Sequence, residues 1–200
     1  MPVSRQKKQQ QMANLVQLVF FLGLLLISSI IYYFLAVRPS GQLPGLFPVS
    51  VSPAFFLWLI IGLVFPLLFL YVFLKLLPSM DLIYDPNVRI LANMYSLPFM
   101  VIYFLANAFV EELLFRGAIQ YAFGLFPAVI LFTLAHISYY KKPVMLIEVF
   151  VLGLFFGLLY TASQSIWICT VCHAFYNWIL MWLIKTDRIA YYPASNAVIR

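Results

Sequence analysis

Long apolar runs separated by short polar stretches constrain this chain more than any other feature. A membrane-spanning helix needs about 20 apolar residues, and six runs reach or approach that length. They cover residues 14–37, 53–77, 97–122, 127–140, 144–161 and 166–184. The composition agrees, because 65% of the residues are hydrophobic and only 9% are charged, against about 45–50% and about 25% in soluble domains. We therefore predict an all-α, polytopic transmembrane helix bundle of about six spans.

Some segments between and within these runs carry further expectations. The fourth run, residues 127–140, is short enough to lean or re-enter the bilayer instead of crossing it. The more polar stretch before the third run is expected to hold a short interfacial helix around residues 87–95. The first run exceeds the roughly 7–15 residues of a signal-peptide core, so we expect it to be retained as a span.

Basic residues predict the orientation of the chain. The net charge of +6 is spread between the apolar runs instead of forming a patch, so we expect no nucleic-acid partner. With a cytoplasmic N-terminus, every Lys and Arg except Arg38 and Arg116 falls on the cytoplasmic side, as the positive-inside rule requires. We predict a multi-pass protein of the plasma membrane, embedded in the lipid bilayer, with both termini cytoplasmic.

Three charged residues interrupt the third apolar run, at Glu111, Glu112 and Arg116. Each costs roughly 2.5–3.5 kcal/mol at the centre of a bilayer on insertion scales. Glu112 and Arg116 are four residues apart, so on a helix they can pair. Glu111 lies about 100° around the same helix and can face a cavity. A buried ion pair that fixes helix packing would explain Glu112 and Arg116 but not Glu111.

Two histidines follow on other runs. His136 lies four residues after Phe132, and His173 lies four residues before Asn177. A single histidine inside a membrane typically donates a hydrogen bond between helices. Two histidines and a surplus glutamate on three helices instead indicate a functional site, because ionisable residues inside a membrane are by default functional.

The chain resembles a known family at these residues. Glu111-Glu112-x-x-x-Arg116, Phe132-x-x-x-His136 and His173-x-x-x-Asn177 are similar, in order and spacing, to the motifs of the CPBP intramembrane proteases. This CAAX-protease and bacteriocin-processing family, also called Abi, is related to the type II CAAX prenyl endopeptidase. The resemblance covers about residues 95–185, and Gln164 stands where the family often has glycine.

The resemblance implies a CAAX-protease-like core formed by the last four spans. We accordingly predict three regions. They are an N-terminal two-span region with a cytoplasmic tail and interfacial segment (1–96), the protease core (97–185) and a cytoplasmic C-terminal tail (186–200).

The resemblance also implies an activity, intramembrane cleavage of a peptide bond in a membrane-associated peptide or protein. Glu111 and His136 would bind and activate a water molecule, with Glu111 as the general base. His173 and Asn177 would hold the oxyanion that develops on the scissile carbonyl. Glu112 and Arg116 would form a supporting pair. Bacterial relatives connect this activity with bacteriocin processing or self-immunity.

Alternatives remain open at this point. A divalent metal such as zinc could bind Glu111, His136 and His173, whose side chains are metal-ligand types. The sequence lacks His-Glu-x-x-His, the helical zinc pattern, and we favour metal-free catalysis. The protein could also be a non-catalytic immunity or scaffold protein, or a proton-coupled carrier. We expect Glu148, near the cytoplasmic end of the fifth run, to have an interfacial or capping role, and lining of the cavity is the alternative.

Overall fold

Helices form all the regular secondary structure in the computed structural model, which describes residues 3–47, 51–76, 92, 94–186 and 188. The elements are α1 (Val3–Tyr32), η1 (Tyr33–Val37), α2 (Arg38–Ser40), α3 (Pro53–Leu76), α5 (Leu97–Glu112), η3 (Leu113–Gln120), α6 (Tyr121–Phe123), α7 (Leu125–Ala135), η4 (Ile137–Tyr139), α8 (Pro143–Ser163) and α9 (Ile166–Lys185). The predicted interfacial helix around residues 87–95 lies largely outside the described residues.

Five helical stretches among the described residues are long and apolar enough to cross a membrane. They are Asn14–Ser40, Pro53–Leu76, Leu97–Phe123, Pro143–Ser163 and Ile166–Lys185. The prediction of an all-α polytopic bundle is therefore confirmed, with boundaries close to those expected from the apolar runs.

The fourth predicted span is shorter than the others. Its helix, α7, has 11 residues, which at 1.5 Å each reach about half of the roughly 30 Å hydrocarbon core. Gly124 precedes the helix with φ +87°, and His136 ends it with φ −84° and ψ 58°. The chain therefore leaves the helix at His136, and this end of α7 lies within the bundle.

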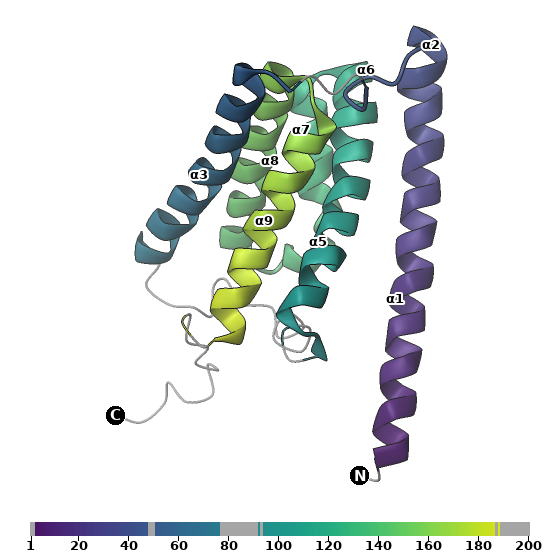
Figure 1. Ribbon diagram of the computed structural model, residues 1–200, viewed down its shortest axis with the longest axis vertical. Helices are drawn as coiled ribbons and strands as arrows, with labels where there is room; N and C mark the ends of the chain where they lie inside the picture. The colour runs from purple at the N-terminus through teal and green to yellow at the C-terminus, as the bar shows by residue number, and fades with distance from the viewer. Residues whose placement is uncertain (1–2, 48–50, 77–91, 93, 187, 189–200) are drawn as a thin grey trace.

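The five helices α3, α5, α7, α8 and α9 stand together as a bundle, and α1 runs along one side (Figure 1). α1 contacts the bundle through η3 and α5. Near the start of α5, the Tyr95 hydroxyl lies 2.7 Å from Asn14 Oδ1 and 2.6 Å from Gln17 Oε1. These polar contacts connect the middle of α1 with the segment just before α5.

Two glycines on α8 bring its neighbours close. A Cβ on Gly153 would lie 2.9 Å from Cδ1 of Phe132, and one on Gly157 would lie 2.4 Å from Cδ1 of Leu125. Gln120 of η3 donates to the carbonyl of Gly157 at 2.8 Å. Because no side chain intervenes, α7 and η3 pack directly on the backbone of α8.

The turn from α8 to α9 places the last helix. Gln164 has φ +52° and ψ 30°, a left-handed conformation that glycine adopts without strain. This explains why glycine suits the position in the family that the sequence resembles. Here the side chain compensates, because Gln164 Nε2 donates to the Thr161 carbonyl at 2.8 Å. Ser165 then caps α9 by accepting from the Ile168 amide.

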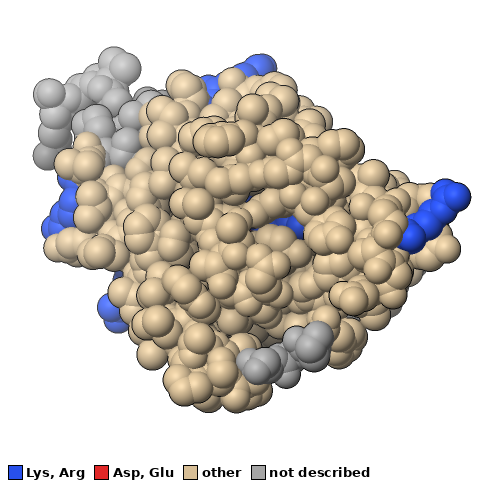
Figure 2. All heavy atoms as spheres, turned by 90° about the horizontal axis from the view of Figure 1, so that it is seen from above, with Lys and Arg blue, Asp and Glu red and all other residues tan. Residues whose placement is uncertain are grey.

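Basic residues at the helix ends are distributed unequally between the two ends of the bundle. Lys75 lies in the last turn of α3, Lys142 precedes α8 and Lys185 ends α9. These three helix ends lie at the same end of the bundle (Figure 1). Arg38 lies at the opposite end, in α2. Seen from the α2 end, the surface is mostly uncharged, with no Asp or Glu in view (Figure 2). The direction in which the bundle crosses the membrane stays a prediction.

Candidate active site

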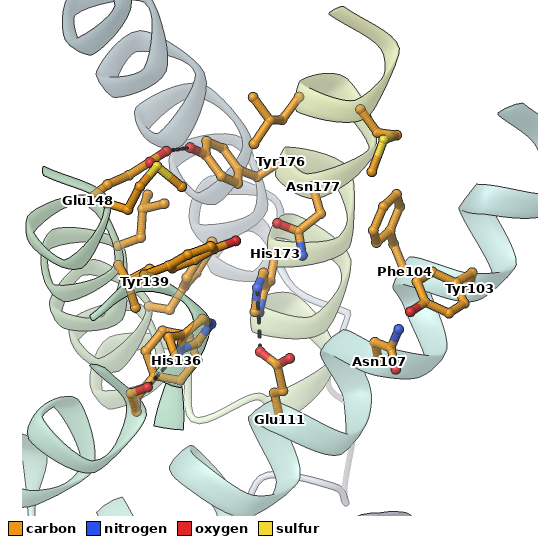
Figure 3. Close-up of a pocket in the computed structure, with 17 residues that line it drawn as sticks. Tyr103, Phe104, Asn107, Glu111, His136, Tyr139, Glu148, His173, Tyr176 and Asn177 are labelled. Carbon is orange, nitrogen blue, oxygen red and sulfur yellow. Dashed lines mark hydrogen bonds and ion pairs between the residues drawn. The ribbon is translucent and has the colours of Figure 1, made fainter. Parts of the chain in front are cut away.

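A cavity of about 280 Å³ lies between α5, the end of α7, α8 and α9. Its polar lining comes from Tyr103, Asn107, Glu111, His136, Tyr139, Glu148, His173, Tyr176 and Asn177. Figure 3 shows these side chains arranged around the central His173. The four residues predicted to carry the chemistry, Glu111, His136, His173 and Asn177, are all among them.

The third span changes its winding beside the two glutamates. The α-helix ends at Glu112 and a π-helix, η3, continues from Leu113 to Gln120. Such segments are rare and occur frequently at functional sites. The side chain of Glu111 is 37% exposed and lines the cavity, whereas that of Glu112 is completely buried. Only Glu111 is thus accessible to a molecule in the cavity.

Arg116 is the buried partner of Glu112. Its Nε lies 3.2 Å from Glu112 Oε2, and its Nη2 donates to the Gly153 carbonyl at 3.0 Å. The guanidinium carbon lies 4.6 Å from the centre of the Phe132 ring. A buried charge needs a partner of opposite charge and further hydrogen bonds. Arg116 finds these on three different helical segments, and it holds them together.

His173 contacts both glutamates. Its Nδ1 lies 2.8 Å from Glu112 Oε1, and its Nε2 lies 3.8 Å from Glu111 Oε2. The ring stacks on Phe156 with a centroid separation of 5.1 Å. Because a carboxylate can only accept, Nδ1 carries the hydrogen. The contact between Glu112 and His173 was not foreseen in the sequence, where Glu112 was paired only with Arg116.

The backbone determines the tautomer of His136. Its Nδ1 lies 2.8 Å from the Phe132 carbonyl oxygen, which can only accept, so Nδ1 is the donor. In the neutral ring Nε2 is then an acceptor. The ring lines the cavity, and its other nitrogen lies on the cavity side (Figure 3). The spacing Phe132-x-x-x-His136 thus sets which nitrogen meets a ligand.

The expectation for Glu148 was wrong. Its side chain is not interfacial but buried, with 3% exposure, and it lines the cavity. The Tyr176 hydroxyl donates to Glu148 Oε1. The prediction considered only how far Glu148 lies from the start of the span. The surroundings of the side chain instead depend on the face of the helix that carries it. That face of α8 packs toward α9.

The cavity contains further polar residues that sequence reasoning missed, namely Tyr103, Asn107, Tyr139 and Tyr176. Asn107 precedes Glu111 by four residues, and this spacing places both on one helix face. The sequence therefore contained a spacing that could have identified Asn107 as a cavity residue. No comparable signal distinguishes Tyr176 from the many other aromatic residues of the apolar runs.

The described part of the chain does not bring together a full set of metal ligands. Among the described residues, no group of three or more His, Cys, Asp or Glu side chains lies close enough together to hold a metal ion. Glu111 and His173 approach each other, but His173 Nδ1 is engaged by Glu112. The three residues predicted as alternative zinc ligands are therefore not gathered into a metal centre, and we derive no step through a metal.

The bundle and its buried ionisable residues define a multi-pass membrane protein with a polar cavity between its helices. Residues 93–179 match the model of the family described as type II CAAX prenyl endopeptidase Rce1-like. All three motifs lie within this range, and the resemblance inferred from them is confirmed. This part of the chain is therefore similar to the CAAX-type intramembrane proteases.

One curated relative is similar to about half of the chain. It is the uncharacterized protein YpbD of Bacillus subtilis (strain 168), which is 28% identical over 94 residues. The alignment covers 47% of this chain and 50% of the relative, so the chain spans about half the length of the curated relative that it matches. No solved structure matches the chain significantly.

Proposed function

We propose that the protein is an intramembrane endopeptidase that hydrolyses a peptide bond of a membrane-associated peptide or protein. One observation carries the proposal. Glu111 on α5, His136 at the end of α7, and His173 and Asn177 on α9 line one cavity, although 66 residues separate the first from the last in the chain. A carboxylate, two imidazoles and an amide can together supply a general base and hydrogen-bond donors for an oxyanion, two functions that catalyse peptide hydrolysis.

Glu111 and His136 activate the water in this proposal. The Glu111 carboxylate and His136 Nε2 are both acceptors, so one water can donate a hydrogen bond to each. The lone pairs of its oxygen then remain available for attack on the carbonyl carbon of the peptide. As the new C–O bond forms, Glu111 takes the proton of the water as general base.

His173 and Asn177 stabilise the oxyanion that forms on the carbonyl oxygen. Because Glu112 engages Nδ1 of His173, a neutral ring would present an acceptor at Nε2. The oxyanion role therefore requires the imidazolium form, in which both nitrogens donate. The Asn177 amide supplies a second donor. Collapse of the intermediate breaks the C–N bond, and Glu111 passes its proton to the leaving amine nitrogen.

Glu112 and Arg116 support the site without contacting the substrate. Glu112 holds His173 in place, and Arg116 neutralises Glu112. We propose catalysis without a metal, at the plasma membrane, with both termini cytoplasmic. The biological role proposed is bacteriocin processing or self-immunity.

The test compares membranes from cells that produce the wild type with membranes that contain Glu111→Ala, by proteomic detection of new peptide N-termini. We expect a set of termini that depends on the wild type and is absent with Glu111→Ala. Equal amounts of both proteins must reach the membrane. Identical termini in the two samples would overturn the proposal.

The same strains separate the enzyme from a non-catalytic immunity or scaffold protein. If the protein protects cells from a bacteriocin, Glu111→Ala should abolish the protection. Full protection by this variant would favour the scaffold function, because its fold is intact and only the general base is lost.

A further inference from the structure

Glu148 and Tyr176 form a second polar pair in the cavity wall. They belong to α8 and α9, and neither takes part in the proposed chemistry. Figure 3 shows the pair on the far side of the cavity from Glu111, with His173 and Asn177 between them. A peptide that reaches from the general base across the cavity would meet this pair.

The Glu148 carboxyl group is only half satisfied. Tyr176 donates to Oε1, whereas Oε2 is buried and has no hydrogen-bond partner in the described part of the chain. Leaving a buried polar atom unpaired costs about 1–3 kcal/mol, so such atoms call for an explanation. A hydrogen bond that only connects α8 with α9 would need Oε1 alone. Because Glu148 also lines the cavity, we take its unpaired Oε2 as the atom that a ligand would contact.

The charged residues around the cavity indicate the chemistry of this ligand. No Lys or Arg belongs to its described lining, whereas Glu111 and Glu148 both do. Arg116 is committed to Glu112 and the Gly153 carbonyl, and Lys185 donates to the backbone carbonyls of Ala92 and Tyr95. The hydrogen-bond donor that pairs with the Glu148 carboxyl oxygen therefore comes from the ligand.

We propose that Glu148, held by Tyr176, accepts a hydrogen bond from an N–H group of the bound peptide and so determines which peptides are cut. This inference rests on the proposed endopeptidase function. The donor is either a backbone amide of the peptide or a basic side chain. Both share the chemistry of an N–H group that points at a buried oxygen acceptor.

The test uses Glu148→Gln, which keeps the size of the side chain but removes its charge. The probe is a quenched fluorescent peptide that spans a cleavage site found by comparing wild type with Glu111→Ala. We expect KM to rise by about 10-fold or more, as for the loss of a hydrogen bond to a charged group, while kcat changes less than about 2-fold. Ile147→Leu is the matched control, because Ile147 is the exposed neighbour of Glu148 on the same helix.

Two peptide series distinguish the sources of the N–H group. In one, each basic residue is replaced by norleucine, and in the other each backbone amide is methylated in turn. Whichever replacement raises KM for the wild type should have no further effect in Glu148→Gln, because the two changes remove the same contact. Additive effects in both series would overturn the inference.

Tyr176→Phe is the second variant, in case Glu148→Gln does not fold. It removes the hydroxyl that orients Glu148, so it should also raise KM without lowering kcat. Unchanged KM in the folded variants, or a fall in kcat alone, would overturn the inference but leave the proposed function intact. If the wild type cuts no peptide, the proposed function itself fails.

Discussion

Glu111 and Glu112 are neighbours in the chain, but their side chains lie in different surroundings. Glu111 reaches the cavity with 37% exposure, whereas Glu112 is fully buried between Arg116 and His173. The helix rotates by about 100° per residue, so adjacent side chains leave it in different directions. One glutamate is thereby available for chemistry and the other for holding the site together.

The first prediction separates these two roles. Glu112→Ala leaves Arg116 buried without its carboxylate, and breaking a buried pair costs about 3–5 kcal/mol. We expect a large loss of thermal stability for the protein in detergent, measured by unfolding. Glu111→Ala is the matched control, with near wild-type stability but no cleavage. Equal stability of the two variants would contradict the assignment of Glu112 to the buried pair.

At the scale of elements, the short helix α7 carries His136 to the cavity. The position of α7 depends on close packing against α8, where the Phe132 ring lies over Gly153. The Gly153 carbonyl also accepts from Arg116. One residue of α8 without a side chain therefore controls both the depth of α7 and the environment of the ion pair.

The second prediction tests this packing with Gly153→Ala. The new Cβ would lie 2.9 Å from Phe132 Cδ1, so Phe132 and the end of α7 must shift. We expect a destabilisation of about 1–3 kcal/mol, as for other overpacked sites, and a lower cleavage rate because His136 moves. The control is Gly23→Ala in α1, where a Cβ meets nothing within 4 Å. Similar unfolding temperatures for the two variants would contradict the proposed packing.

At the scale of the whole molecule, the distribution of charge between the two ends predicts the orientation in the membrane. Lys75, Lys142 and Lys185 lie at one end and Arg38 at the other. Positive-inside topology then places the three lysines in the cytoplasm. The cavity approaches this end, because Glu148 lies near the start of α8.

The third prediction follows from this orientation. Gln42 and Thr186 are exposed at opposite ends of the bundle, and both native cysteines are buried, so single introduced cysteines give a clean signal. A membrane-impermeant maleimide should label Gln42→Cys in intact cells and Thr186→Cys only after permeabilisation. The reverse pattern would contradict a cytoplasmic location for the C-terminal end of α9.

The sequence by itself determined the spans, because the length of an apolar run and the thickness of a bilayer are directly comparable. It also indicated Glu111, His136 and His173, because ionisable residues inside apolar runs stand out energetically, and the family resemblance added Asn177. It determined the pair of Glu112 and Arg116 because both lie within one helical turn. All these signals are local or compositional, and none depends on how the helices pack.

The tertiary structure alone decided which side chains meet across helices. It joined His173 to Glu112, 61 residues away, and Glu148 to Tyr176, 28 residues away. It also turned Glu148 from an expected interfacial or capping residue into part of the cavity wall. Apolar residues surround every face of these helices, so the sequence carries no periodic signal for the face that turns inward. Only the packing of distant segments selects that face.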